Sequence, residues 1–182
     1  FGRPSATTRW LRGFGRGEIS GSYSGTSTAG EMTLQAQSRR LVFDLAGRLR
    51  PSFGAWDGDI ARLDGRFDDF DFDAEGGRFA YAAGGSLRLE EVTGRLSGSR
   101  LDLHSLQLRP QAGVWQGAAD FRISDLALAP HVEGLEDLLT LAGDVAVDAS
   151  LSGTAPELGR LAAAMSGQGR LSGQVRLAPA PG

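Results

Sequence analysis

The sequence predicts a mostly β domain, built on one long curved antiparallel sheet with one or two short helices in its last third. Apolar and polar residues alternate in many short runs, as in strands with one buried face. Glycine supplies 27 of the 182 residues, about twice its usual share, and separates these runs. Apolar residues at helical spacing occur only near the C-terminus. Such a sheet would form a groove, a half-open barrel or a sandwich.

The chain divides into three parts by composition. Residues 1–16 hold four arginines and no acid, which indicates a basic N-terminal segment, either loosely held or touching anionic lipid headgroups. Residues 17–177 carry the strand signals and are expected to form one domain. Residues 178–182, "APAPG", are typical of a linker or of the cut end of a longer chain.

The strand signals follow one another along the chain. "LVFDLAG" places Leu41, Phe43 and Leu45 on one face, because successive side chains of a strand point to opposite sides. In the acidic stretch from Asp64 to Gly77, the same alternation turns the phenylalanines inward and the carboxylates outward. The later pairs predicted to share a face are Phe70 with Phe72, Leu87 with Leu89, Leu101 with Leu103, Phe121 with Ile123, and Val145 with Val147.

This alternation changes phase twice. After Leu103 the apolar residues fall at 106 and 108, and after Ile123 they fall at 126 and 128. One extra residue in a strand reverses its faces, and a β-bulge or a bend is the usual cause. The sequence therefore predicts a bulge or a bend at each of these two places.

Helical signals are confined to the last third of the chain. In "TAPELGRLAAAMSG", Thr154 is expected to cap a helix and Gly167 to end it, with an apolar stripe of Leu158, Leu161, Ala162 and Met165. A second short helix is expected in "PHVEGLEDLLTLAG", where Val132, Leu135, Leu138 and Leu139 have helical spacing.

Asp69, Asp71 and Asp73 have the alternate spacing of a calcium loop. The sixth position of such a loop is Ala74 instead of glycine and the twelfth is Ala80 instead of glutamate. The carboxylates are therefore interpreted as the solvated side of a strand. The sequence has no cysteine and two histidines, which argues against a zinc site, and no metal or cofactor is expected.

No enzyme motif stands out. Asp102 and His104 share a strand face and have the types of a catalytic pair, but no serine elbow accompanies them. The glycine clusters "GFGRGE" and "GQGRLSG" depart from the dinucleotide fingerprint. A net charge of −3 argues against nucleic-acid binding. A non-catalytic protein is expected, with a glycan- or lipid-acting enzyme using Asp57 and Asp59 as a remote alternative.

The stretch from Leu138 to Leu177, with "SLSGTAPEL", a short helix and "MSGQGRLSG", resembles the bacterial AsmA-like superfamily, as does the strand-rich body from Gly65 onward. The resemblance implies a periplasmic domain whose full-length protein is anchored in the inner membrane. It implies a curved sheet that binds or conducts phospholipid along an apolar groove, serving lipid transport or outer-membrane biogenesis. Envelope proteins are possible further partners.

On this hypothesis the apolar strand residues would line the groove. The candidates are Phe70, Phe72, Leu87, Leu89, Leu101, Leu103, Phe121 and Ile123. The same alternation also builds a closed core, so the alternative is a structural or assembly module of an envelope or secretion complex with a fully packed interior.

Overall fold

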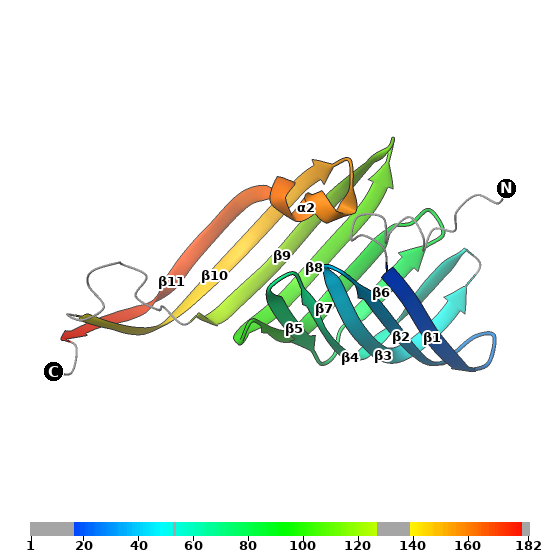
Figure 1. Ribbon diagram of the computed structural model, residues 1–182, viewed down its shortest axis with the longest axis horizontal. Helices are drawn as coiled ribbons and strands as arrows, with labels where there is room; N and C mark the ends of the chain where they lie inside the picture. The colour runs from blue at the N-terminus through cyan, green and yellow to red at the C-terminus, as the bar shows by residue number, and fades with distance from the viewer. Residues whose placement is uncertain (1–16, 53, 127–138, 180–182) are drawn as a thin grey trace.

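The computed structural model describes residues 17–52, 54–126 and 139–179 (Figure 1). It confirms a mostly β fold, since these residues form one large antiparallel sheet and one short helix. The elements are β1 (Gly17–Gly25), β2 (Gly30–Ser38), β3 (Leu41–Ser52), β4 (Ala55–Phe67), β5 (Phe70–Ala74), β6 (Arg78–Ala82), β7 (Leu87–Leu96), β8 (Ser99–Gln111), β9 (Val114–Leu126), β10 (Leu139–Ala155), α2 (Leu158–Ala164) and β11 (Ser166–Pro179).

The sheet is a meander, in which each strand turns back beside the one before it. The order is β1-β2-β3-β4-β5-β7-β8-β9-β10-β11, and β6 pairs with β4 and β7 next to the short β5. Figure 1 shows that the sheet is strongly twisted and that β10 and β11 extend to one side of it. The sheet begins at Gly17 and ends at Pro179, so two residues of the expected terminal linker lie in β11.

Two tight turns explain why neighbouring long strands pair so regularly. Ser97 and Gly98 have φ angles of 49° and 85°, and Ala112 and Gly113 have 49° and 86°. Two residues in succession with positive φ are the mark of a type I′ turn, whose twist matches that of the flanking strands. These turns set the registers of β7 with β8 and of β8 with β9.

At both places where a bulge or a bend was predicted, the structure has a bulge. The register of β8 against β9 shifts between Leu103 and Ser105, which makes His104 the extra residue. The register of β9 against β10 shifts between Val145 and Val147, beside Asp125 with its φ of 57°. A third shift, between β3 and β4 at Ala46, was not predicted. Each bulge returns the apolar side chains to the same face of the sheet.

The helix begins later than predicted. β10 continues through Thr154, which pairs with Gln116, and the residue before the helix is Glu157 without a side-chain cap. The prediction of Thr154 as the cap was wrong because the β10–β9 ladder already uses that residue. Gly167 does not end the helix either, because it already lies in β11, where it pairs with Leu151 of β10.

The helix stripe is confirmed in part. Leu158 and Leu161 are buried and Met165 is half-buried, whereas Ala162 is exposed. Of the second predicted helix, Val132, Leu135 and Leu138 lie outside the described residues. Leu139 is the first residue of β10.

The acidic stretch behaves as a solvated strand face, with one correction. Asp71 and Asp73 are exposed on β5, while Asp69 lies in the turn before it. Phe72 is half-buried as expected, but Phe70 is 56% exposed instead of turned into a core. Phe70 is the first residue of its strand, next to the turn, where few neighbours can cover a large ring.

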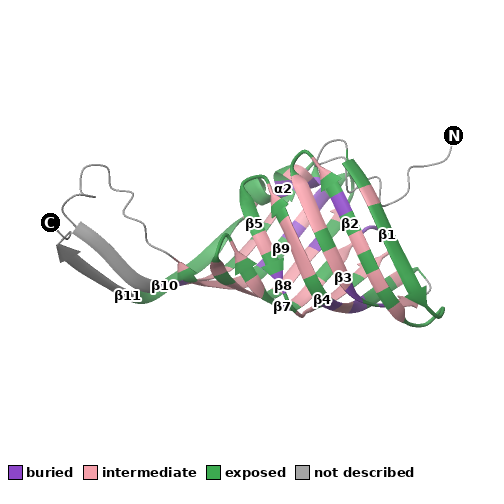
Figure 2. Cartoon of the chain, turned by 60° about the horizontal axis from the view of Figure 1, so that its bottom comes forward, coloured by how far each residue is buried: buried purple, intermediate pink, exposed green. Residues whose placement is uncertain are grey.

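The core consists of two small clusters (Figure 2). One joins Ile60, Ala74 and Val92 in the middle of the sheet. The other lies under α2 and contains Leu108, Trp115, Ala155, Leu158 and Leu161. No side chain in the described part of the chain is completely inaccessible to solvent. A single layer of strands with one short helix cannot enclose more than this.

Candidate functional site

The strand registers bring apolar side chains from every strand to one face of the sheet. Directly paired residues share a face, and Leu34 pairs with Leu45, which in turn pairs with Leu63. The members, here called the apolar face, are Ile19, Tyr23, Met32, Leu34, Leu41, Phe43, Leu45, Leu49, Trp56, Ile60, Leu63, Phe67, Phe70, Phe72, Phe79, Tyr81, Leu87, Leu89, Val92, Leu96, Leu101, Leu103, Leu106, Leu108, Trp115, Phe121, Ile123, Val145, Val147, Leu151 and Leu171.

All eight residues proposed from the sequence lie on the apolar face. Leu101 pairs with Ile123 and Leu103 with Phe121, so four of them form a contiguous patch on β8 and β9. Seven are half-buried, and only Phe70 is exposed. The residues are therefore brought together as expected, yet none of the eight is fully covered.

Sequence reasoning missed the contribution of β2 and β6. Met32 and Leu34 on β2, and Phe79 and Tyr81 on β6, lie on the same face. The signal was present, since "EMTLQAQ" and "RFAYA" alternate like the strands that were recognised. Their shortness and small neighbours made them less visible than the phenylalanine- and leucine-rich runs.

Within residues 17–52, 54–126 and 139–179, the cover of the apolar face is confined to one end of β9 and β10. There α2 places Leu158 and Leu161 in a cluster with Trp115. Elsewhere the face includes large side chains in contact with water: Trp56 is 51% exposed and Leu171 is 71% exposed. Exposed apolar surface of this extent is typical of a binding site.

Glycines on the apolar face make room for the rings of the neighbouring strand. A Cβ atom added at Gly58 would lie 2.7 Å from the ring of Phe79, and one at Gly65 would overlap the ring of Phe72. The rings therefore lie flat over glycine backbone instead of standing upright. Aromatic rings over glycines are a recognised device for curving a sheet while protecting its backbone.

The opposite face is charged, and several of its charges are paired. Arg50 donates to Asp57 at 2.9 Å and to Asp59 at 2.7 Å. Hydrogen bonding from Arg50 lowers the pKa of Asp59 below its usual value. Arg122 donates to Asp148 at 3.1 Å. Asp57 and Asp59, considered above as a remote catalytic pair, are thus both held by one arginine and serve to solvate this face.

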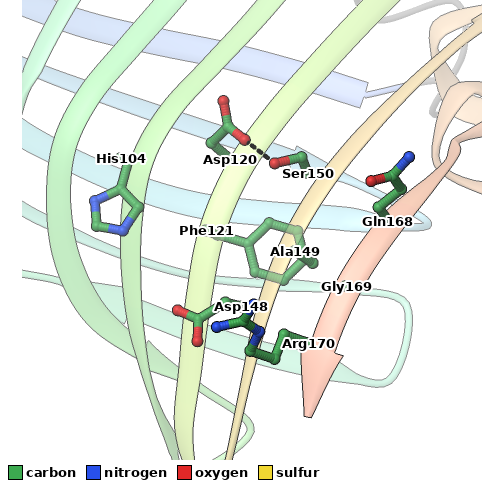
Figure 3. A pocket seen from close by; sticks show the side chains of 9 residues that line it. All are labelled: His104, Asp120, Phe121, Asp148, Ala149, Ser150, Gln168, Gly169 and Arg170. Atoms are coloured by element: carbon green, nitrogen blue, oxygen red, sulfur yellow. Dashed lines mark hydrogen bonds between the residues drawn. The ribbon is translucent and has the colours of Figure 1, made fainter. Parts of the chain in front are cut away.

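The residues around His104 form a shallow polar depression where β8, β9, β10 and β11 run side by side (Figure 3). Ser150 donates a hydrogen bond to Asp120, so this hydroxyl is not held by the imidazole. Asp102, the expected partner of His104, accepts from Arg100 at 3.2 Å.

The described ranges contain no group of three or more histidine or acidic side chains close enough to hold a metal ion. Among these residues there is also no helix with the length and hydropathy needed to cross a bilayer.

Comparisons of the chain with protein-family models, with curated proteins and with solved structures find no match. No family is assigned to it. The function is therefore inferred from the geometry of the apolar face.

Proposed function

We propose that this domain binds the acyl chains of a phospholipid along its apolar face, without catalysis. The observation that carries the proposal is that, among the described residues, an apolar face spanning all the strands is covered only at one end, by a seven-residue helix. The sequence resemblance described above supports a setting in the periplasm, in a protein anchored to the inner membrane. There the domain would contribute to lipid transport or outer-membrane biogenesis.

The energetics favour acyl chains as the ligand. Burying one methylene stabilises a complex by about 0.8 kcal/mol, so a chain of ordinary length is held without a specific polar contact. The patch formed by Leu101, Leu103, Phe121 and Ile123 offers side chains that are already partly covered, which limits the conformational entropy lost on binding. The charged opposite face keeps the domain in solution while the apolar face is occupied.

The alternative of an assembly module has less support. A fully packed interior needs a second layer against the apolar face, whereas the described strands belong to a single sheet. The edge strands β1 and β11 remain open to other chains, but their edges alone do not explain why the apolar face is so extensive.

The test is native mass spectrometry with lipid extraction, on the domain purified from a Gram-negative host. Two variants add a carboxylate to the apolar face, Phe72→Asp and Leu103→Asp. The matched control, Gln107→Asp, adds the same carboxylate to the opposite face of β8, beside Arg88 and Ala118 in the neighbouring strands.

We expect co-purified phospholipid with the wild type and with the control, and at least a tenfold loss with either apolar-face variant, because a buried charge carries a large desolvation cost. Circular dichroism establishes that each variant is folded. A wild-type protein that carries no lipid and takes up none on addition would contradict the proposal. Equal loss in the Gln107→Asp control would show that the apolar face is not the site.

A further inference from the structure

The tryptophans and tyrosines of the described residues lie at one end of the sheet. Tyr23 is two residues from the end of β1, and Trp56, Tyr81 and Trp115 are each next to a strand terminus. The ladders connect these positions, since Ala55 pairs with Ala82 and the start of β9 pairs with the end of β10. The phenylalanines Phe67, Phe70 and Phe72 lie toward the other end. The two ends of the apolar face therefore differ in their chemistry.

Four hairpin turns at the end with the tryptophans and tyrosines are uncharged. Their described residues are 26–29, 54, 83–86 and 112–113, and they consist of glycine, alanine, serine and threonine. The connection through α2 at the same end carries one ion pair, between Arg160 and Glu157 at 3.6 Å. At the opposite end, two of the three described hairpin turns carry charges, at 39–40 and at 68–69, with Arg40 bound to Asp68 at 2.6 Å. In Figure 1 the turn from β1 to β2 lies at the lower right and the turn from β8 to β9 at the top, both away from the extended ends of β10 and β11.

Two of these rings are open to water. Trp56 is 51% exposed and Tyr23 is 42% exposed. Beside Trp56, on the paired strand, lies Tyr81, with ring centroids 5.9 Å apart, and burial raises the pKa of the Tyr81 hydroxyl. We call Tyr23, Trp56, Tyr81 and the uncharged turns the aromatic rim.

Tryptophan and tyrosine combine an apolar ring with a polar N–H or O–H group. This combination favours the boundary between hydrocarbon and water, whereas phenylalanine has no polar group to place there. The absence of charge in these hairpin turns removes the desolvation cost that a charged turn would incur on approaching lipid. An arginine- or aspartate-lined rim would instead favour a charged partner.

We propose that the aromatic rim docks on the surface of a phospholipid bilayer, so that lipids pass between the bilayer and the apolar face at this end of the strands. The passage of lipids rests on the proposed function. Docking of the aromatic rim on the bilayer does not depend on that function, and it is tested separately. The rim recognises the neutral interfacial region of the bilayer, not anionic headgroups.

The experiment is flotation of the whole chain with phosphatidylcholine vesicles in high salt. Neutral lipid and high salt suppress any contribution from the arginines of residues 1–16. The variants are Trp56→Ser and Tyr23→Ser. The matched control is the double variant Trp56→Ser with Ser99→Trp, which keeps the composition but moves the indole to the opposite end of the same face, where Ser99 pairs with Leu96.

We expect the wild type to float, each single variant to bind about three- to tenfold more weakly, and the double variant to be as weak as Trp56→Ser. Recovery of binding in the double variant would overturn the rim and indicate unspecific adhesion. A wild-type protein that stays in solution would overturn docking on lipid and leave the rim to a protein partner. Bound lipid, measured by mass spectrometry on the same samples, tests the proposed function independently. A protein that fails to dock on vesicles can therefore still bind lipid, and a protein without bound lipid can still dock.

Discussion

At the scale of single residues, the apolar face depends on glycine as much as on the large side chains. A strand with a ring at every inward position would have no room for its neighbours. Gly58 is buried because the ring of Phe79 lies over it. Alternation of large and small residues therefore lets a single layer of strands curve without a second layer to support it.

We predict that Gly58→Ala destabilises the domain by about 1–3 kcal/mol, as overpacking does. Its Cβ atom would lie 2.7 Å from the Phe79 ring and would also meet the carbonyl oxygen of Arg48. Urea unfolding followed by circular dichroism measures the change. Gly84→Ala is the control, since a Cβ atom there meets nothing within 4 Å. Equal destabilisation by the two variants would contradict this account.

At the scale of elements, α2 matters more than its seven residues suggest. It is the one described helix, and it converts the end of β9 and β10 into a packed cluster. Gly117 permits this, because a Cβ atom there would lie 2.8 Å from Leu161. The helix thus closes one end of the apolar face, and no other described element packs over the rest.

We predict that Leu161→Ala lowers the free energy of unfolding by about 2–5 kcal/mol, because Leu161 is 3% exposed and its removal leaves a cavity. Trp115 packs in the same cluster, so its fluorescence should shift to longer wavelength as water reaches it. Ala162→Ser, at an exposed position of the same helix, should change stability by less than about 0.5 kcal/mol. A Leu161→Ala protein as stable as the wild type would show that α2 is not part of the core.

At the scale of the whole molecule, an open sheet is stabilised by whatever covers it. The domain has two small clusters of buried residues and a face of half-buried side chains. A ligand that binds only the folded state adds stability by mass action, about 2.7 kcal/mol at a concentration a hundredfold above its dissociation constant.

We predict that a short-chain phosphatidylcholine, kept below its micelle concentration, raises the Tm of the delipidated domain by about 5–10 °C. Glycerophosphocholine has the same headgroup but no acyl chains and should leave the Tm unchanged. Differential scanning calorimetry measures both. A similar rise with both compounds would assign the interaction to the headgroup and would contradict binding by the apolar face.

The candidate site was predictable in its residues but not in its exposure. Alternation identified Leu101, Leu103, Phe121 and Ile123, and the phase change after Leu103 located the bulge at His104. The capping pattern at Thr154 predicted the wrong start for the helix, because a capping pattern is local and the pairing of β10 with β9 is not. Local signals lose to a ladder of hydrogen bonds whenever the two compete for the same residues.

By itself, the sequence determined most of the strands, the side chains on them that share a face, and two of the three places where that face would otherwise reverse. These follow from the two-residue period of a strand. Only the tertiary structure decided how the described residues are arranged: their apolar side chains form one open layer, α2 covers a single end of it, and their tryptophans and tyrosines gather at one rim. Those outcomes depend on registers and turns that bring distant residues together, and alternation is the same whether the face is closed or open.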